Sequence, residues 1–278
     1  MSRDLQASQA RGAAALLTIV TTTHLIPSAP SVWILRKTLH SLRRRMQVSG
    51  CEHRIYYDAP SLPNSRHAAY LDNLKTLAAS HGLGLLVRPG SGLKANYLHA
   101  VDTVQTPYML FLEHDWTFRR DVDLPRLLQV FERHAFVNYV KFNKKANDAR
   151  FMWDHFVEPE DRVAELSLTR TSGWSNNPHI ARLSKWRSSW RQIVGERPEA
   201  GSSGIEEKLY FEYGKGIFTR GFRETHADWG CMLYGALDDP AMVRHINGSL
   251  SRAWYAEPFA KLRRLAQRQA RRFRQLAT

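Results

Sequence analysis

Tyr108-Met109-Leu110-Phe111-Leu112-Glu113-His114-Asp115-Trp116 runs from five apolar or aromatic side chains into an acidic tripeptide, and Pro107 precedes it. A short, unbroken apolar run after a proline is typical of a buried, parallel strand. A desolvated carboxylate is unfavourable without a partner, so Glu113 and Asp115 at the end of such a strand point to a ligand. Open α/β sheets bind ligands at the carboxyl ends of their strands, where carboxylates can hold a divalent cation. The alternative is a solvated turn in which both residues are ordinary surface acids.

Strands and helices alternate upstream of this run. Apolar, β-branched or aromatic segments predict strands, and apolar residues at helical spacing predict helices between them. The predicted strands are residues 16–22, 51–57 and 83–87, and the predicted helices are residues 31–45, 70–81 and 94–104. Three repeats of this alternation predict an α/β fold with a doubly wound, mostly parallel sheet, right-handed connections and helices on both faces.

The second half of the chain has a weaker pattern. The predicted elements are helices at residues 124–134, 180–190 and 205–213 and a strand at residues 136–142. Residues 143–175 are rich in charged and aromatic side chains without a clear period, which suggests a functional insert or long loops. We expect a single domain over residues 12–250 and a separate basic helix over residues 251–278.

Length, composition and cysteine content limit the class of protein. A chain of 278 residues with 43% hydrophobic residues can bury a substantial core. Cys51 and Cys231 form neither a disulfide framework nor a metal-binding spacing, so a reducing compartment is expected. The longest apolar patch near the N-terminus, residues 13–20, is too short to span a bilayer. These features together predict a cytoplasmic protein.

The net charge of +14 is unevenly distributed along the chain. Residues 252–278 contain eight Lys or Arg and one Glu, so 8 − 1 = +7 lies in the tail. On a helix, the apolar residues of 259–276 fall on one arc and the basic residues on the other. Such a helix suits an anionic membrane surface, which would place the protein at the inner face of the membrane. The alternative is a terminal helix docked on the sheet with a solvated basic face.

Several acidic and polar motifs occur in a definite order. Asp58 follows the second predicted strand, Gly92-Leu93-Lys94-Ala95-Asn96 opens a helix, and the apolar run enters Glu113-His114-Asp115. An acidic pair, Glu206-Glu207, follows about ninety residues later. In this order the chain resembles the GT-A nucleotide-sugar glycosyltransferases, and is similar to the family 2 group, over roughly residues 14–250. The family's metal motif is usually Asp-x-Asp, so Glu113 is a departure, although both side chains are hard oxygen donors.

The resemblance implies a metal-dependent transfer with Mn²⁺ or Mg²⁺ as the cofactor. Asp115 would bind the cation with Glu113 nearby, and His245 would complete the metal or diphosphate site. The cation would act as a Lewis acid toward the departing diphosphate. Without a metal, Asp115 would be a helix N-cap or turn acid, and a lone histidine such as His245 is more often structural.

Five residues are assigned to the nucleotide part of the donor. By resemblance, Asp58 lies beside the base or ribose, Glu113 lies near the ribose, and Thr22 ends the first strand beside them. Lys94 and Asn96 follow a Gly-rich loop at a helix N-terminus, which is a natural place to bind a phosphate. The alternatives are an Asx turn at Asp58 and an ordinary solvated lysine and helix cap at Lys94 and Asn96.

The acceptor hydroxyl needs a general base. By resemblance Glu207 or Glu206 supplies it in an inverting reaction, with Glu207 preferred as the last acid of the pair. Acid-rich first turns also arise merely from the helix dipole. The implied partners are a nucleotide-sugar donor and a glycan or lipid-linked acceptor in polysaccharide biosynthesis. Trp116, Trp174 and Trp229 could stack on sugar rings, although core packing is the commoner fate of tryptophan.

Two other classes of function remain open. A nucleotidyltransferase would share the sheet and the acids, but Thr21-Thr22-Thr23-His24 lacks the Gly-rich signature expected after the first strand. A non-catalytic nucleic-acid-binding protein would explain the positive charge and the aromatic residues. It would leave the acids after the buried strand unexplained, since acids repel phosphate. Nucleic acid is therefore an unlikely partner.

Overall fold

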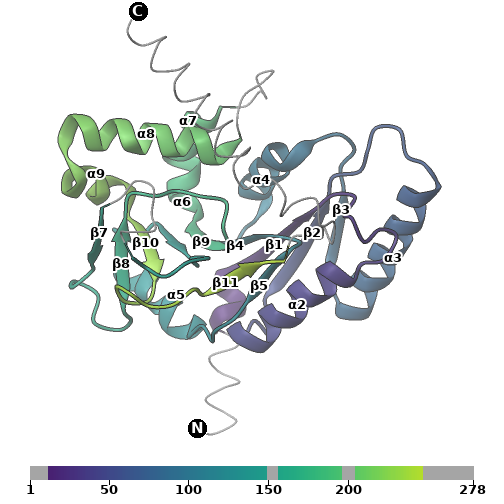
Figure 1. Cartoon of the computed structure of the whole chain (residues 1–278), viewed down its shortest axis with the longest axis horizontal. Coiled ribbons are helices and arrows are strands. Elements are labelled where there is room, and N and C mark those ends of the chain that lie inside the picture. The colour runs from purple at the N-terminus through teal and green to yellow at the C-terminus, as the bar shows by residue number, and fades with distance from the viewer. Residues whose placement is uncertain (1–11, 149–155, 196–203, 247–278) are drawn as a thin grey trace, which may run out of the picture. The chain divides into compact units, whose positions relative to one another are not determined.

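The computed structural model describes residues 12–148, 156–195 and 204–246, which lie in the unit that ends at Ile246 (Figure 1). A nine-stranded sheet in the order β3-β2-β1-β4-β9-β6-β10-β8-β7 forms its centre. The four strands on the β3 side are parallel, β9 is reversed, and β6 and β10 run parallel again. Strands β8 and β7 complete the sheet with antiparallel pairing, so only β9 and β8 oppose the common direction. The predicted α/β, GT-A-like fold is confirmed.

The strands of the large sheet are short, as is usual for sheets of this kind. In chain order they are β1 Leu17–Thr23, β2 Glu52–Tyr57, β3 Gly84–Val87, β4 Tyr108–Glu113, β6 Tyr139–Lys141, β7 Val157–Pro159, β8 Leu168–Thr171, β9 His179–Arg182 and β10 Cys231–Tyr234.

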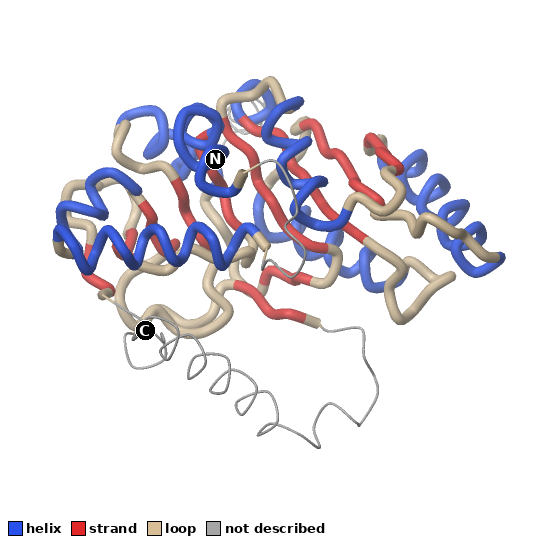
Figure 2. Tube along the Cα trace, turned by 90° about the horizontal axis from the view of Figure 1, so that it is seen from above, coloured by secondary structure: helices blue, strands red, loops and turns tan. Residues whose placement is uncertain are grey.

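Strand β4 lies at the centre of the hydrophobic core. Tyr108, Leu110 and Leu112 join one buried cluster, whereas Met109 and Phe111 join another on the opposite face. Both faces are covered by helices (Figure 2), which explains why the strand is apolar at every position rather than at alternate ones.

The helices divide between the two faces of the sheet. Helices α2 (Trp33–Met46), α3 (Ser65–His81) and α5 (Leu124–Arg133) pack on the face of Leu110. The opposite face is covered by α4 (Gly92–Thr103), by α8 (Ile205–Arg220) and by the helical segment that follows β9. That segment comprises α6 (Leu183–Lys185), the π-helix η2 (Trp186–Trp190) and α7 (Arg191–Val194), and the last helix is α9 (Phe222–Trp229).

Several predicted boundaries need correction in the second half. Residues 180–190 were predicted to be one helix, but His179–Arg182 form strand β9 before the helical segment begins. Ile180 and Ala181 are fully buried between β4 and β6, where the sheet supplies their backbone partners. The strand predicted at 136–142 is confined to β6, and the predicted loop region 143–175 contains β7 and β8. Helix α8 is longer than predicted and ends at Arg220.

A two-stranded ribbon lies outside the large sheet. Strand β5 (Trp116–Phe118) follows β4 directly and pairs with β11 (Val243–His245) in antiparallel fashion. The ribbon packs beside α2, where Ser41 accepts a hydrogen bond from the backbone nitrogen of Phe118. The predicted basic helix at 251–278 lies outside the described residues. Within them, no helix is both long and apolar enough to cross a membrane.

Candidate functional site

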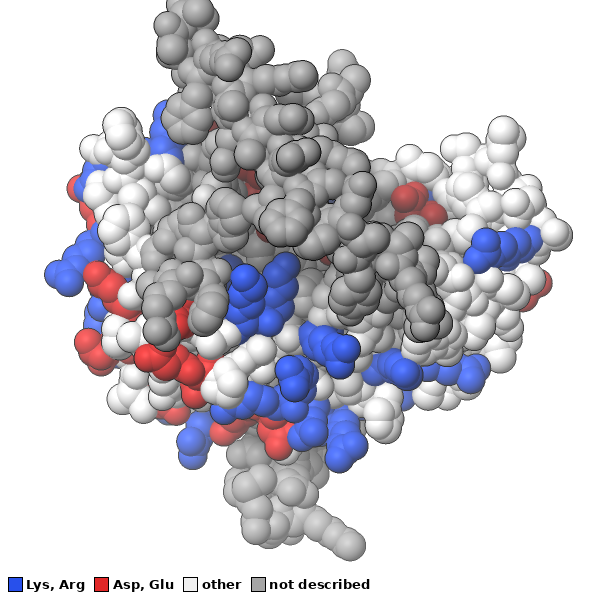
Figure 3. All heavy atoms as spheres, in the orientation of Figure 1, with Lys and Arg blue, Asp and Glu red and all other residues white. Residues whose placement is uncertain are grey.

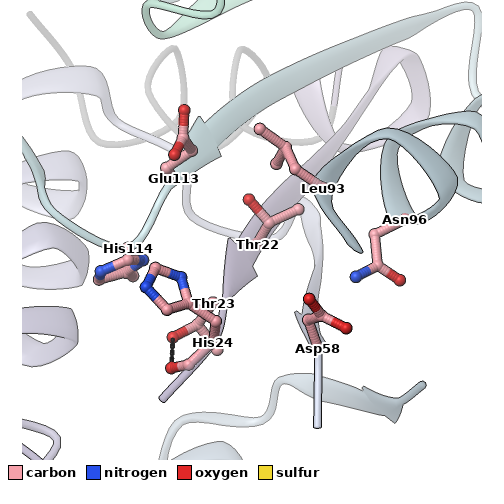
Figure 4. Close-up of a pocket in the computed structure, with 8 residues that line it drawn as sticks. All are labelled: Thr22, Thr23, His24, Asp58, Leu93, Asn96, Glu113 and His114. Carbon is pink, nitrogen blue, oxygen red and sulfur yellow. Dashed lines mark hydrogen bonds between the residues drawn. The ribbon is translucent and has the colours of Figure 1, made fainter. Parts of the chain in front are cut away.

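The site lies where parallel strands β1, β2 and β4 end at the same edge of the sheet. A pocket of about 300 Å³ opens there between the strand ends and the first turn of α4 (Figure 4). Its lining residues are Thr22, Thr23, His24, Asp58, Leu93, Asn96, Glu113 and His114. Four of the five residues that the sequence assigned to the nucleotide, Thr22, Asp58, Asn96 and Glu113, therefore surround one space.

Asp58 and Asn96 form one wall of the pocket. Asp58 Oδ1 accepts a hydrogen bond of 3.0 Å from the backbone nitrogen of Gly92, so this carboxylate fixes the start of α4. Ser91 Oγ donates to Asn96 Oδ1 at 2.9 Å, which leaves the amide nitrogen of Asn96 on the side that faces Thr22 and Asp58 in Figure 4. That nitrogen is buried and finds no acceptor among the described residues. A buried donor in this position is suited to an oxygen of a ligand.

Lys94 lies on the same first turn of α4 and is half-buried. It is not among the residues that line the pocket of about 300 Å³. The structure thus separates the two residues that the sequence assigned together to this helix, since Asn96 lines the pocket.

Asp115 and His245 form the other part of the site. Asp115 follows the end of β4, and the pairing of β11 with β5 places His245 opposite Trp116. His245 Nε2 lies 2.9 Å from Asp115 Oδ2, and the two aromatic rings of His245 and Trp116 are 4.6 Å apart. The backbone nitrogen of Ile246 also donates to Asp115 O, so β11 is attached to the motif at two points. Residues 130 positions apart are thereby brought together (245 − 115 = 130).

Burial and charge shift the pKa values of the motif in different directions. Burial, with the nearby carboxylate of Asp115 as the second cause, raises the pKa of Glu113 to about 7. Burial alone would raise the pKa of Asp115, but its hydrogen bond with His245 and the charge of His114 hold it below its ordinary value. Burial lowers the pKa of His114 to about 4, so this imidazole is neutral at neutral pH. At neutral pH Asp115 is therefore ionised, whereas Glu113 retains its proton far more readily than an ordinary glutamate.

The donor set fits a hard divalent cation completed by a substrate. Asp115 Oδ1 is buried and has no hydrogen-bond partner among the described residues, and Glu113 is destabilised in its charged form. No group of three or more His, Cys, Asp or Glu side chains in the described part of the chain is assembled as a metal site. Mg²⁺ and similar ions commonly use one or two carboxylates together with substrate phosphates rather than a complete protein cage. The two carboxylates of Asp115 and Glu113 match that partial set, and His245 is bound to one of them.

The acidic pair lies in the first turn of α8. Glu206 is exposed, and its charge acts on Glu113 across the site and on Lys141 at the end of β6. Glu207 is half-buried and is not among the charges that shift Glu113. Of the two residues, Glu206 is the one whose charge raises the pKa of Glu113.

Lys141 is a functional candidate that sequence reasoning did not find. It is almost completely buried, and its Nζ donates to the backbone oxygen of Gly173 at 3.0 Å. Burial lowers its pKa to about 8, and Glu206 opposes that shift. Sequence reasoning also assigned no role to His24, although this polar residue directly follows a buried strand, as Asp58 does. Its ring contacts His114 edge to face at 4.8 Å and lines the pocket.

The tryptophans proposed to stack on sugar rings belong to the core instead. Trp174 is 1% exposed and Trp229 is 7% exposed, and both lie in the cluster with Trp186 and Trp190. Trp229 stacks on Tyr213 with ring centres 4.7 Å apart. Trp116 is also buried, and its ring supports His245.

Comparison with known proteins supports the fold and leaves the family open. No protein-family model and no curated protein sequence matches this chain. It is similar to two solved structures of S. aureus TarS, a family 2-like glycosyltransferase, at 13% identity in both cases. Each match covers 82% of this chain; one covers 59% of a TarS chain of residues 1–349 with a TM-score of 0.48, and the other covers 36% of a longer chain with a TM-score of 0.50. This chain thus spans about a third to three fifths of the TarS chains, and the likeness to the longer chain, at a TM-score of 0.50, shows a shared fold.

Proposed function

We propose that the protein is a glycosyltransferase that moves a sugar from a nucleotide-sugar donor to a hydroxyl group of a glycan or lipid-linked acceptor. One observation carries the proposal: Glu113, two residues before the Asp115–His245 pair, lines a pocket together with Asn96, whose amide nitrogen has no acceptor among the described residues. Anionic and polar groups at the carboxyl ends of parallel strands suit a ribose, a diphosphate and a cation. The shared fold with TarS, a family 2-like glycosyltransferase, agrees with this function.

In this proposal the pocket binds the nucleotide. Asn96 Nδ2 donates a hydrogen bond to a ribose or phosphate oxygen. Asp58 accepts a hydrogen bond from a hydroxyl group of the nucleotide sugar and also keeps α4 in place through Gly92. Thr22 supplies a hydroxyl at the end of β1. Asp115, Glu113 and His245 would hold Mn²⁺ or Mg²⁺, which supplies Lewis-acid stabilisation of the departing diphosphate. The imidazole of His114 lies 3.9 Å from Asp115 Oδ2 and, because burial lowers its pKa to about 4, adds no positive charge at neutral pH.

Glu206 is the preferred general base for the acceptor hydroxyl. It is exposed at the start of α8, so an acceptor can reach it, and its charge acts on Glu113 of the strand β4 motif. A base on the opposite side of the sugar from the diphosphate removes the proton of the attacking hydroxyl as the new bond forms. A single displacement of this kind inverts the anomeric carbon. Glu207, the half-buried neighbour, is the alternative base.

A ligand screen combined with one substitution tests the proposal. UDP-, GDP-, dTDP- and CMP-sugars are measured for thermal stabilisation with Mn²⁺, with Mg²⁺ and in EDTA, since a specific ligand raises apparent stability by mass action. We expect one nucleotide class to stabilise the protein only with a divalent cation, and Asp115→Asn to remove that stabilisation without lowering the melting temperature of the free protein. Full turnover by Asp115→Asn, or in EDTA, would refute the metal role.

The reaction products distinguish the proposed glycosyltransferase from a nucleotidyltransferase. A nucleotidyltransferase releases pyrophosphate from a sugar 1-phosphate and a nucleoside triphosphate, whereas a glycosyltransferase releases a nucleoside diphosphate from a UDP-, GDP- or dTDP-sugar, or CMP from a CMP-sugar. Detection of the first product without the second would replace the proposal. A cytoplasmic location, at the inner face of the membrane if the acceptor is lipid-linked, accompanies the proposal as an expectation.

A further inference from the structure

Five exposed basic side chains gather on the face of the unit formed by α2 and the β5–β11 ribbon. We call Lys37, Arg44, Arg119, Lys144 and Arg244 the basic face. In Figure 3, Lys and Arg atoms are concentrated over these elements. Lys37 and Arg44 lie two turns apart on α2, about 10 Å along the helix and on the same side of it. Arg119 follows β5, and Arg244 lies on β11 opposite Thr117.

None of the five members of the basic face forms an ion pair with a carboxylate among the described residues. Two acids near the ribbon are already engaged, since Asp121 pairs with Arg45 at 2.8 Å and Asp239 lies 3.8 Å from Arg120. Several other exposed cations do have carboxylate partners: Arg126 pairs with Asp123, Arg133 with Glu165, and Arg220 with Asp228. Unpaired like charges on one face repel one another and attract polyanions.

The basic face reaches the border of the candidate site. Arg244 directly precedes His245, whose imidazole is bound to Asp115. Lys144 lies over the ring of Trp116, 6.0 Å from its centre, and Trp116 directly follows Asp115. A ligand that lies along α2 and the ribbon would therefore end beside the carboxylates.

We infer that the basic face binds the acceptor, and that this acceptor is a linear polymer with repeated oxyanion groups. Guanidinium and ammonium groups bind phosphate or carboxylate oxygens through charge-assisted hydrogen bonds. The inference rests on the proposed glycosyltransferase function and adds the chemical class of its acceptor. A membrane surface fits less well, because peripheral membrane proteins also bury apolar side chains in the lipid. The exposed large apolar residues of the described chain, Leu62, Val87, Phe156, Phe211, Phe218 and Leu237, all lie outside α2, β5 and β11.

The test uses the full-length chain, fluorescent inorganic polyphosphate and polyglutamate as probes, and two matched triple variants. Arg119→Gln/Lys144→Gln/Arg244→Gln removes three charges from the basic face. Lys75→Gln/Arg126→Gln/Lys215→Gln removes three exposed charges from α3, α5 and α8, so both variants have the same net charge. The basic residues of 251–278 are present in every protein, and their contribution cancels in the comparison.

We expect the basic-face variant to bind one or both polymers about tenfold more weakly at 100 mM salt, and the control variant to change less than about twofold. The slope of log Kd against log salt should fall by about 2 in the basic-face variant, at roughly 0.7 for each lost contact. The polymer that binds more tightly identifies phosphate or carboxylate as the preferred group. Equal losses in both variants would overturn the inference, because net charge alone would then explain binding.

Two further measurements distinguish polymer binding at the basic face from membrane binding and from binding in the donor site. Vesicles with about 30% phosphatidylserine should sediment both triple variants equally; loss of vesicle binding with polyphosphate binding retained would make the face a membrane surface and overturn the inference. Stabilisation by the nucleotide sugar should persist in saturating polyphosphate. Displacement of the donor would place the polymer in the diphosphate site and also overturn the inference. If no nucleotide sugar stabilises any variant, the proposed function fails, whereas the polymer-binding comparison still has its own outcome.

Discussion

Replacement of Glu113 by glutamine should stabilise the folded protein at alkaline pH and leave its stability unchanged at acidic pH. Burial and the charge of Asp115 raise the pKa of Glu113 from 4.5 to about 7 in the folded state. Below pH 4.5 the carboxyl group is protonated in both states, so it carries no penalty. Between pH 4.5 and 7 the unfolded chain releases the proton while the folded protein retains it, so stability falls as pH rises. Above pH 7 the penalty is constant.

The size of the penalty follows from the two pKa values. Their difference of about 2.5 corresponds to ~3 kcal/mol at about 1.4 kcal/mol for each pKa unit. Glutamine keeps the shape of the side chain and cannot ionise, so Glu113→Gln removes this penalty. The variant should therefore be more stable than the wild type by about 3 kcal/mol at pH 8 and nearly equal to it at pH 4.5.

Urea unfolding in EDTA from pH 4.5 to pH 8 measures this difference directly. EDTA is needed because a bound cation would itself relieve the repulsion between Glu113 and Asp115. Glu212→Gln on α8 is the control, since its carboxylate is half exposed and, among the described residues, pairs with Lys215 alone, at 3.9 Å. If the difference in the free energy of unfolding between wild type and Glu113→Gln does not change with pH, the raised pKa assigned to Glu113 is refuted.

Three further predictions concern the base, one turn and the tail. Glu206→Gln should lower kcat by ~10²–10⁴ with donor affinity unchanged, and Glu207→Gln by less than tenfold; the reverse order in steady-state kinetics would transfer the role of base to Glu207. Gly230→Ala should lower the free energy of unfolding by at least about 2 kcal/mol, because φ is +61° and an added Cβ would lie 1.9 Å from the backbone oxygen of Phe136. Gly214→Ala inside α8 has open space and should be neutral or stabilising in the same urea titration. A chain ending at Tyr255 should lose salt-sensitive sedimentation with anionic liposomes, and equal sedimentation of the two chains would exclude the tail as an anchor.

The first half of the fold could be predicted closely from the sequence because its signals are local. Strand β4 is buried on both faces and is therefore apolar throughout, and α3 ends at Gly82, whose left-handed φ of +64° favours glycine. Strand β9 could not be predicted. A short buried segment such as Ile180-Ala181 has the same composition in a core helix and in a central strand. Its pairing with β4 and β6 decides between them, and that pairing is non-local.

Some residues of the candidate site could also be predicted from local sequence patterns, and others could not. Polar residues that directly follow apolar strands, such as Asp58 and Asp115, can be found in the sequence, and the structure places them at one edge of the sheet. The choice between Glu206 and Glu207 depends on the rotation of α8, which no local pattern determines. Lys141 in a short strand looks like a surface residue in the sequence, yet β9 and β10 bury it.

The position of β9 also has a consequence for how the protein assembles. Among the described strands, its four residues are the only hydrogen-bonded link between the β3-β2-β1-β4 half of the sheet and the half that begins at β6. Its partner β4 lies 74 residues earlier in the chain (182 − 108 = 74), so both halves present an apolar open edge until β9 is inserted. Open apolar edges pair readily with other chains. Refolding yield should therefore decrease as protein concentration rises, and dilution during refolding should increase it.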